Sequence, residues 1–248
     1  MSSVSKRMRV FAGPNGSGKS TILKVVQDQG IDIGTYINAD DYKKSINENH
    51  NFDFSDSGSS LNKELFIVSF KKSTLFEKAD GECLLSSLSY QDNHLLFSES
   101  YLVNDYFTSF LASYIREQLL TNSNKFTFET VMSHPSKLEF MSLAKEKGFK
   151  VYLYFVSLAN PELNKQRVDF RVKNGGHSVP PKDIENRYYR TMGFLYDAIR
   201  IADSSYIFDN SYSEPKLFAT VVNKEIKITD GKTTIPLWFQ KYVLDKLK

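Results

Sequence analysis

The stretch RVFAGPNGSGKSTIL, from Arg9 to Leu23, decides the fold. Its core, from Gly13 to Ser20, matches the pattern G-x-x-x-x-G-K-S/T at every fixed position. The apolar residues before the core predict the end of a buried strand, and the residues from Ser20 onward predict the first turns of a helix. Strand, loop and helix therefore follow one another in the order that a phosphate-binding loop requires.

The loop predicts a nucleotide site. Glycines let backbone N–H groups turn inward around phosphate oxygens, and the start of the helix adds unpaired N–H groups and a positive dipole end. We expect Lys19 to reach the β- and γ-phosphates and the Ser20 hydroxyl to bind Mg²⁺. The expected cofactors are ATP (or GTP) and Mg²⁺. The predicted nucleotide-binding residues are Gly13, Pro14, Asn15, Gly16, Ser17, Gly18, Lys19, Ser20 and Thr21.

Composition narrows the class of protein. The chain has 248 residues with 41% hydrophobic content, which fits a globular core. Its 32 basic and 29 acidic residues give a net charge of +3, so neither nucleic acid nor an anionic membrane is an expected partner. The single cysteine, Cys83, excludes an internal disulfide, and we expect it to be buried. With no apolar run long enough for a signal peptide or a membrane span, the expected location is the cytoplasm.

Strand and helix signals alternate along the chain. Aromatic and β-branched runs predict strands at Thr35–Asp41, Lys125–Met132, Lys150–Leu158 and Ser205–Ser211. Strands separated by helices predict a parallel sheet covered on both faces. The expected fold is thus an α/β three-layer sandwich of the P-loop NTPase type with a mainly parallel sheet, formed by a single domain over residues 1–248.

Several helices carry clear end signals. Asn160-Pro161-Glu162 predicts the start of one helix and Asn174-Gly175-Gly176 its end. Another helix is expected after Pro180-Pro181, and a third over Asn104–Leu120. The second of these has apolar residues that form one buried stripe at Ile184, Tyr188, Met192, Leu195 and Ile199.

Two regions lie outside this alternation. Residues 44–101 are polar and turn-rich at first and then mix strand-like with helix-like runs, so we expect an insertion after the second strand. Residues 212–248 alternate between polar and apolar, and Asp230-Gly231 predicts a hairpin turn in a C-terminal extension of edge strands.

Polar residues follow three of the predicted strands, where ligands bind in open α/β sheets: Asp40, Glu129 and the Asp209-Asn210 pair. Asp40 could accept a proton from a substrate hydroxyl or hold Mg²⁺ through water, while its neighbour Asp41 is expected to cap the next helix. Glu129 is expected to bind substrate, against the alternative of an ordinary strand-end salt bridge. Thr130 and His134 follow around the same strand end, and we expect them to face the acceptor.

Two pairs of arginines predict a helical lid. Arg167 and Arg171 are four residues apart on one predicted helix, and Arg187 and Arg190 are three apart on the next. Both pairs could cover the phosphates if the Gly175-Gly176 pair acts as a hinge. The alternative is two solvated helix faces, and spacing alone does not choose between them.

Taken together, AGPNGSGKST, INADD, FTFETVMSHPSKLEF, RVKNGGHSVPPKDIENRYYRTM and YIFDNS resemble the zeta-toxin family of phosphate-loop kinases, whose members are also labelled predicted ABC-type ATPases. The resemblance covers most of residues 8–211. It implies a kinase that phosphorylates a small hydroxylated acceptor, plausibly the 3′-hydroxyl of the sugar in UDP-N-acetylglucosamine. It also implies a separate antitoxin protein as a partner that covers the nucleotide site.

The resemblance further implies roles for matching positions. Lys19 and Ser20 match the loop lysine and hydroxyl, Asp40 matches the catalytic base, and Glu129 matches an acid that contacts the sugar. Arg171 matches an arginine that neutralises the transferred phosphate, and Arg187 or Arg190 would supply the second positive charge. The resemblance therefore favours a functional lid over two solvated helix faces.

Two alternatives use the same loop without kinase activity. An ABC-type ATPase should carry an L-S-G-G-Q signature, and the nearest stretch, LLSSLSYQ (Leu84–Gln91), lacks its glycines. A P-loop ATPase or a nucleotide-dependent switch stays open, although the retained Asp40 argues against it.

Overall fold

The computed structural model of the chain describes residues 5–176, 178–229 and 234–247. Two compact units make up the chain. The first comprises Met1–Ile33 and Thr127–Lys248, and the second comprises Gly34–Phe126. The insertion expected at 44–101 lies inside the second unit.

The first unit is built on a mainly parallel sheet, which confirms the α/β fold. Its strands run in the order β10-β9-β8-β7-β1-β6. β1 pairs parallel with β7, and β7 pairs parallel with β8, whereas β9 and β10 are antiparallel additions at one edge. The strand bounds are β1 (Arg7–Ala12), β6 (Lys125–Thr130), β7 (Lys150–Ser157), β8 (Ser204–Asp209), β9 (Lys216–Val222) and β10 (Glu225–Ile228).

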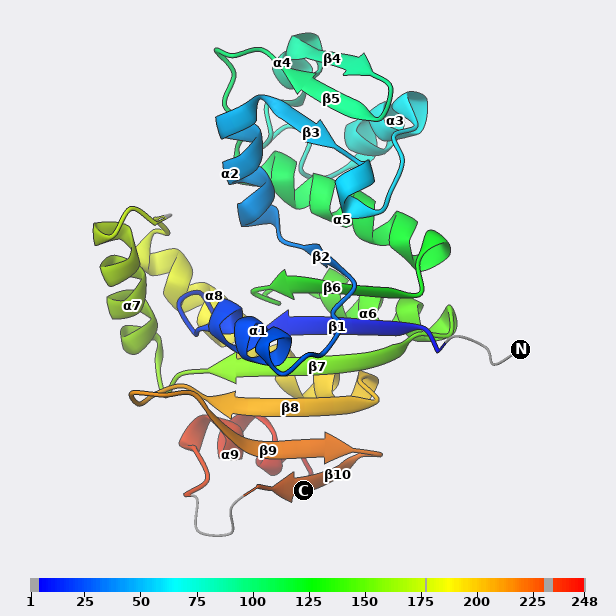
Figure 1. Cartoon of the computed structure of the whole chain (residues 1–248). Coiled ribbons are helices and arrows are strands. Elements are labelled where there is room, and N and C mark those ends of the chain that lie inside the picture. The colour runs from blue at the N-terminus through cyan, green and yellow to red at the C-terminus, as the bar shows by residue number, and fades with distance from the viewer. Residues whose placement is uncertain (1–4, 177, 230–233, 248) are drawn as a thin grey trace. The chain divides into compact units, whose positions relative to one another are not determined.

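Helices cover both faces of this sheet (Figure 1). α1 (Lys19–Asp28) lies on one face, and α6 (Ser136–Glu146) and α8 (Pro181–Ile201) lie on the other. α7 (Pro161–Lys173) follows β7 and packs on α8. The strands are buried on both sides, as β1 shows, because every residue from Met8 to Ala12 is buried.

The predicted helix ends are confirmed. The Asn160 side chain accepts a hydrogen bond from the Leu163 N–H at the start of α7. At its end, Gly175 has a φ of 81°, and the Gly175 and Gly176 N–H groups donate to the carbonyls of Val172 and Arg171. This pair of bonds is the Schellman arrangement that ends many helices. The buried stripe expected on α8 is also present.

The C-terminal region begins with the expected edge strands and ends in helices. β9 and β10 form a hairpin whose turn is at Asn223 and Lys224, with φ values of 52° and 68°. Two consecutive residues with positive φ are typical of a type I′ turn. The expected turn at Asp230-Gly231 lies outside the described residues. After it the chain is helical rather than extended, with α9 (Leu237–Tyr242) and the short 3₁₀ helix η2 (Leu244–Leu247).

The second unit has an aromatic core of its own. Its elements are β2 (Thr35–Ile37), α2 (Ala39–Asn49), β3 (Asn51–Asp53), η1 (Ser55–Ser57), α3 (Lys63–Lys72), α4 (Gly81–Ser87), β4 (Leu88–Gln91), β5 (His94–Phe97) and α5 (Asp105–Asn122). β3, β5 and β4 form a small antiparallel sheet. Phe66 is fully buried at the centre of the core, where its ring contacts those of Phe54, Phe70, Phe107, Phe110 and Tyr114.

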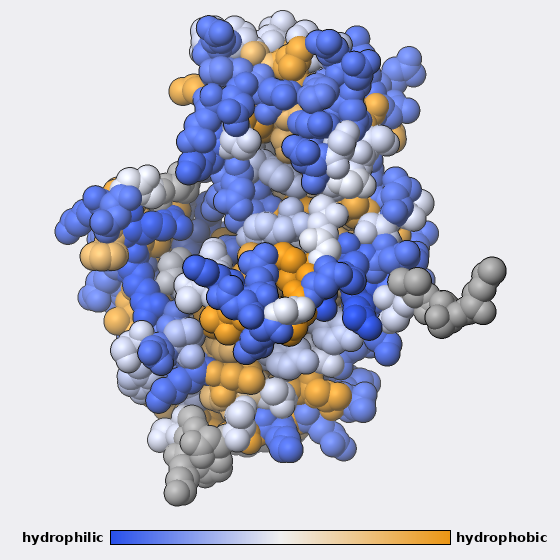
Figure 2. All heavy atoms as spheres, viewed as in Figure 1, coloured by the Kyte–Doolittle hydropathy of each residue, from blue (hydrophilic) through white to orange (hydrophobic). Residues whose placement is uncertain are grey.

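The face of the molecule in Figure 2 is largely polar. Figure 2 shows hydrophilic residues over most of the viewed face, with hydrophobic residues in scattered patches. Cys83 is exposed, contrary to the expectation that it is buried, because it lies on the outer side of the short helix α4. Among the described residues, no helix combines the length and the apolar character needed to cross a bilayer.

Candidate functional site

The phosphate loop connects the end of β1 to the start of α1. Gly18 has a φ of 95° and stands directly before the helix, and a Cβ at this position would overlap the Asn210 side-chain nitrogen. Gly13 has a φ of 152°, and a Cβ there would overlap the Val156 carbonyl oxygen. Both positions therefore require glycine. Lys19 Nζ donates to the Pro14 carbonyl at 3.1 Å, so the lysine folds back along the loop.

Glu129 meets the loop from the end of β6, the strand beside β1. Ser20 Oγ donates to Glu129 Oε2 at 3.0 Å, and Lys19 Nζ lies 3.8 Å from Glu129 Oε1. The side chains of Lys19 and Glu129 are only 8% and 13% exposed. The two strand ends thus bring an ammonium, a hydroxyl and a carboxylate to one point. Substrate binding by Glu129 stays a prediction, because Ser20 and Lys19 are both residues of the loop.

These groups fit a magnesium nucleotide. Mg²⁺ prefers oxygen ligands, and Ser20 and Glu129 offer a hydroxyl and a carboxylate within hydrogen-bond distance of each other. Phosphate oxygens suit the ammonium of Lys19 and the N–H groups at the start of α1. Ser20 would hold the metal directly, and Glu129 would hold it directly or through a bound water.

Two buried asparagines hold the loop in shape. Asn164, from α7, donates through Nδ2 to the Asn15 carbonyl at 2.5 Å. Asn210, after β8, donates through Nδ2 to the Ser17 carbonyl at 2.8 Å. Position at a strand end marked Asn210 as a candidate in the sequence, but Asn164 gave no signal because it reads as one more polar residue in a helix.

Arg167 has a structural partner that the lid hypothesis did not foresee. Its Nη2 donates to the Asn210 carbonyl at 2.6 Å and to the Tyr212 carbonyl at 3.2 Å. Arg167 therefore anchors the segment after β8, and through Asn210 it supports the phosphate loop. The expectation that it covers the phosphates as a partner of Arg171 does not match these bonds.

Thr130 and His134 also have local partners. The Thr130 carbonyl accepts from the Gly13 N–H at 3.3 Å, and Thr130 Oγ1 accepts from the Met132 N–H at 3.0 Å. His134 is exposed, and its Nδ1 lies 3.0 Å from Ser136 Oγ at the start of α6. Both residues shape the segment after β6, and their contact with an acceptor stays a prediction.

α7 and α8 form a helical hairpin with its own small core. Lys165 Nζ lies 2.7 Å from Glu162 Oε1 and 2.8 Å from Glu185 Oε2, so it links the two helices. Hydrogen bonds to these two carboxylates raise the pKa of Lys165. Val168, Val179 and Ile184 pack beneath them. The Gly175-Gly176 pair is explained as the end of α7, and His177 beside it lies outside the described residues.

Arg187 and Arg190, the two candidates for the second lid arginine, differ in exposure. Thr191 Oγ1 donates to the Val131 carbonyl at 2.7 Å, which fixes this side of α8 against the end of β6. Arg187 is half-buried and lies four residues before Thr191, on the same helix face. Arg190 is exposed. Arg171 is half-buried on α7, and the Gly176 backbone packs against its stem.

Asp40 belongs to the second unit and lies in the first turn of α2 rather than at a strand end. β2 stops at Ile37, and the Asn38 side chain caps α2 by accepting from the Asp40 N–H at 3.0 Å. The expectation that Asp41 caps the helix is wrong, because Asn38 already fills that role one residue before the helix begins. Both aspartates are exposed. The role of Asp40 as a base stays a prediction.

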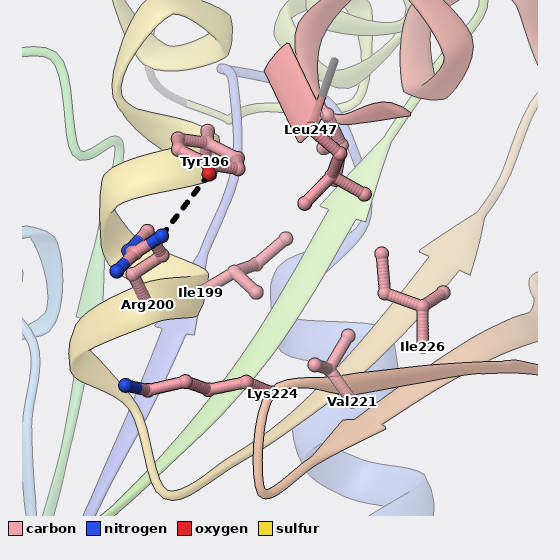
Figure 3. A pocket seen from close by; sticks show the side chains of 8 residues that line it. Tyr196, Ile199, Arg200, Val221, Lys224, Ile226 and Leu247 are labelled. Carbon is pink, nitrogen blue, oxygen red and sulfur yellow. Dashed lines mark hydrogen bonds between the residues drawn. The ribbon is translucent and has the colours of Figure 1, made fainter. Parts of the chain in front are cut away.

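A small hollow lies away from the phosphate loop, at the C-terminal end of α8 (Figure 3). It has a volume of about 50 Å³ and is lined mostly by apolar side chains of α8, β9, β10 and η2. Arg200 Nη1 donates to Tyr196 Oη at 3.2 Å on its wall. The volume is too small for a nucleotide or a sugar. No cluster of three or more potential metal-ligating side chains occurs in the part of the chain that the structure describes.

Residues 97–211 match the family model described as zeta toxin. The resemblance to the zeta toxins is confirmed. The matched segment contains Glu129, Arg171 and Arg187 and ends just after Asn210, whose side chain holds the phosphate loop. It begins after the phosphate loop and Asp40, so the family match gives no support for the roles of those two features.

Other known proteins resemble this chain in part of its sequence or in its fold. A Haemophilus influenzae protein, described only as uncharacterized, is 36% identical over 63 residues, which are 25% of this chain and 45% of that protein. The crystal structure of AvrRxo1-ORF1:AvrRxo1-ORF2 with sulphate ions has a TM-score of 0.57 at 14% identity and covers 92% of this chain and 62% of that chain. The same complex with ATP gives a TM-score of 0.56 at 15% identity over 91% and 61%. The chain thus spans less than two thirds of these relatives, and the structural likeness shows the fold.

Proposed function

We propose that this protein is an ATP-dependent phosphotransferase that phosphorylates a hydroxyl group of a small acceptor, with nucleotide sugars such as UDP-N-acetylglucosamine as the first candidates. The observation that carries the proposal is the meeting of Lys19, Ser20 and Glu129 at the phosphate loop. The zeta-toxin match over 97–211 supports the same reading.

The loop residues would bind and orient the triphosphate. Lys19 places a positive charge on the β- and γ-phosphate oxygens, and the N–H groups at the start of α1 surround them. Ser20 would hold Mg²⁺, which would supply further neutralisation of the phosphate charge. Asn164 and Asn210 would hold the loop backbone in its binding conformation, so the backbone would lose little conformational entropy when the nucleotide binds.

The lid arginines would act on the charge that develops during transfer. Phosphoryl transfer spreads negative charge over the equatorial oxygens, and a correctly placed arginine contributes on the order of 10³–10⁵ in rate in other phosphate-loop enzymes. Arg171 and Arg187 are the candidates, because each is half-buried on a helix that packs near the loop or the end of β6.

Asp40 would take the proton from the acceptor hydroxyl as that oxygen attacks the γ-phosphorus, while the bond from the γ-phosphorus to the bridging oxygen breaks and ADP leaves. A carboxylate in the first turn of a helix is held in place by the backbone and is exposed to an incoming acceptor. A general base of this kind contributes about 10²–10⁴ in rate.

A P-loop ATPase or a nucleotide-dependent switch is the alternative, since both would use Lys19 and Ser20 in the same way. They differ from a kinase in needing no acceptor. A protein partner is also part of the proposal, because the solved neighbour is a complex of two proteins, AvrRxo1-ORF1 and AvrRxo1-ORF2. By analogy, an antitoxin would cover the nucleotide site of this chain.

The test is ATP turnover with and without a panel of UDP-sugars and nucleosides, with products identified by mass. A kinase gives an acceptor-dependent product that is heavier by one phosphoryl group. Lys19→Ala should lose this activity while melting close to the wild type, since the change removes a charge from the phosphates and little packing. Acceptor-independent hydrolysis would favour the ATPase, and wild-type turnover by Lys19→Ala would contradict both readings.

A further inference from the structure

A second polar cavity lies in the first unit, on the sheet face that α1 partly covers. Its volume is about 390 Å³, within the range of small-molecule sites. Arg7 and Arg9 of β1, Tyr152 and Tyr154 of β7, and Tyr206 of β8 form its floor, and the turn at 30–32 after α1 forms its rim.

The sheet register explains why these side chains meet. Arg9 pairs with Tyr152, and Tyr154 pairs with Tyr206, so paired residues point to the same face. Arg7 is two residues before Arg9 and therefore shares that face as well. In Figure 1 the starts of β1, β7 and β8 extend past α1. The phosphate loop is at the opposite end of β1 and of α1, so the cavity is a separate place.

Arg9 is the unusual residue of this cavity. The side chain lies in the middle of a sheet and is only 6% exposed. Its Nε and Nη1 atoms are buried, and neither has a hydrogen-bond partner among the described residues. A buried charged group without full pairing is costly, and proteins retain few of them without a role. Two nitrogen atoms of this rigid guanidinium thus lack a partner beside the cavity that Arg9 lines.

The tyrosines offer hydroxyl groups rather than open ring faces. The Tyr154 ring is stacked between Phe11, with centroids 4.5 Å apart, and Tyr206, with centroids 4.8 Å apart. The Arg9 guanidinium lies 5.7 Å from the centre of the Tyr152 ring. Burial raises the pKa of Tyr154, and Arg9 opposes this effect, so the hydroxyl stays protonated at neutral pH and can donate.

The charge balance selects an anion. Arg7 and Arg9 bring two positive charges, and Asp32 on the rim brings one negative charge. Arginine pairs with phosphate or carboxylate oxygens through two parallel hydrogen bonds. Two guanidiniums and three tyrosine hydroxyls exceed what the two oxygens of one carboxylate can accept, whereas a phosphate group has three or four oxygens.

We infer that this cavity binds the phosphate group of a small organic phosphate, with Arg9 and Arg7 on the phosphate oxygens and the tyrosine edges around the organic part. The site is independent of the proposed kinase activity. The site would be a second anion site, next to the C-terminal end of α1, whereas the phosphate loop lies at its N-terminal end.

Calorimetric titration of the full chain tests this site. The probes are inorganic phosphate and glucose 6-phosphate, each added after the phosphate loop has been saturated with a non-hydrolysable ATP analogue and Mg²⁺. We expect both probes to bind, and tighter binding of glucose 6-phosphate would identify an organic phosphate as the ligand, whereas equal or tighter binding of inorganic phosphate would identify the free ion. Arg9→Met and Arg7→Gln should each weaken binding about tenfold or more, because each removes charge-assisted hydrogen bonds.

The controls separate this site from other causes. Arg7 is exposed, so Arg7→Gln should fold normally even if Arg9→Met does not, and a melting curve checks both. Lys24→Gln removes an exposed cation of α1 outside the cavity and should leave binding unchanged. The same titrations in a Lys19→Ala background should give the same losses, whether or not the phosphate loop binds a nucleotide. No binding by the wild type, or equal binding by folded Arg7→Gln, would overturn the inference.

Discussion

Glu129 contacts both side chains that give the phosphate loop its chemistry. Zeta-toxin resemblance predicts a sugar contact for this acid, while its position beside Ser20 predicts a role at the metal. Because the Ser20 hydroxyl, the expected Mg²⁺ ligand, donates to Glu129 Oε2, we favour the second role. One charge-assisted hydrogen bond contributes about 1.5–3 kcal/mol, which corresponds to roughly a tenfold to hundredfold change in affinity.

Glu129→Gln keeps the shape of the side chain and removes its charge. We expect Mg²⁺-ATP to bind about tenfold or more weakly, with little change in the Michaelis constant for the acceptor. Fluorescent-nucleotide binding and acceptor titrations measure the two effects separately. Glu139→Gln, at an exposed position on α6, is the matched control. A raised acceptor constant with normal nucleotide affinity would instead support the sugar contact.

Asp40 is the proposed general base of the kinase reaction. Asp40→Asn cannot take a proton, and we expect it to bind ATP and acceptor nearly normally while losing about 10²–10⁴-fold in turnover rate. Asp41→Asn tests the neighbouring acid and should retain most of the activity. If Asp40→Asn abolishes Mg²⁺-ATP binding, Asp40 is a metal-site residue, and Glu129 becomes the next candidate for the base.

At the scale of elements, side chains from α7 and from the end of β8 hold the backbone of the phosphate loop through hydrogen bonds. Asn210→Ala removes the bond to the Ser17 carbonyl and leaves that buried oxygen unpaired, at a cost of about 1–3 kcal/mol. We expect a lower melting temperature and a weaker affinity for ATP, because the loop is no longer held in one shape. Asn174→Ala, which removes the Asn174 bond to the Phe170 carbonyl at the end of α7, is the control. It should leave ATP affinity unchanged, and an equal loss in both variants would contradict this role of Asn210.

The elements that the sequence predicted well have local signals. α7 has a cap, a first-turn proline and a glycine end, so both of its ends were found, and α8 has a long buried stripe after a double proline, so its start was found. The start of α2 was misplaced because β2 is only three residues long and Asn38 ends it sooner than the pattern suggests. The β3-β5-β4 sheet was missed because Asn51 pairs with Leu96, far along the chain, and each strand is too short to show a period. Asn164 was missed because its function depends on a contact with the distant Asn15.

At the scale of the whole molecule, the two compact units have separate hydrophobic cores. In the second unit the rings around Phe66 form one aromatic cluster. In the first unit Trp238 is 4% exposed and packs against Phe155 and Phe218. Trp238 is the single tryptophan of the chain, so its fluorescence reports on the first unit alone.

Phe66→Ala should therefore weaken one unit more than the other. Removing a fully buried phenylalanine costs about 3–5 kcal/mol through lost burial and the cavity left behind. We expect backbone amides within 34–126 to exchange with deuterium much faster, while the denaturant midpoint of Trp238 fluorescence shifts little and ATP still binds at the phosphate loop. Leu65→Ala, on the same helix but 53% exposed, should change neither measurement. If Phe66→Ala destabilises both units equally, as judged by deuterium exchange and by the midpoint of Trp238 fluorescence, the two units unfold as one cooperative structure. In that case the loss of packing in one core lowers the stability of the other as well.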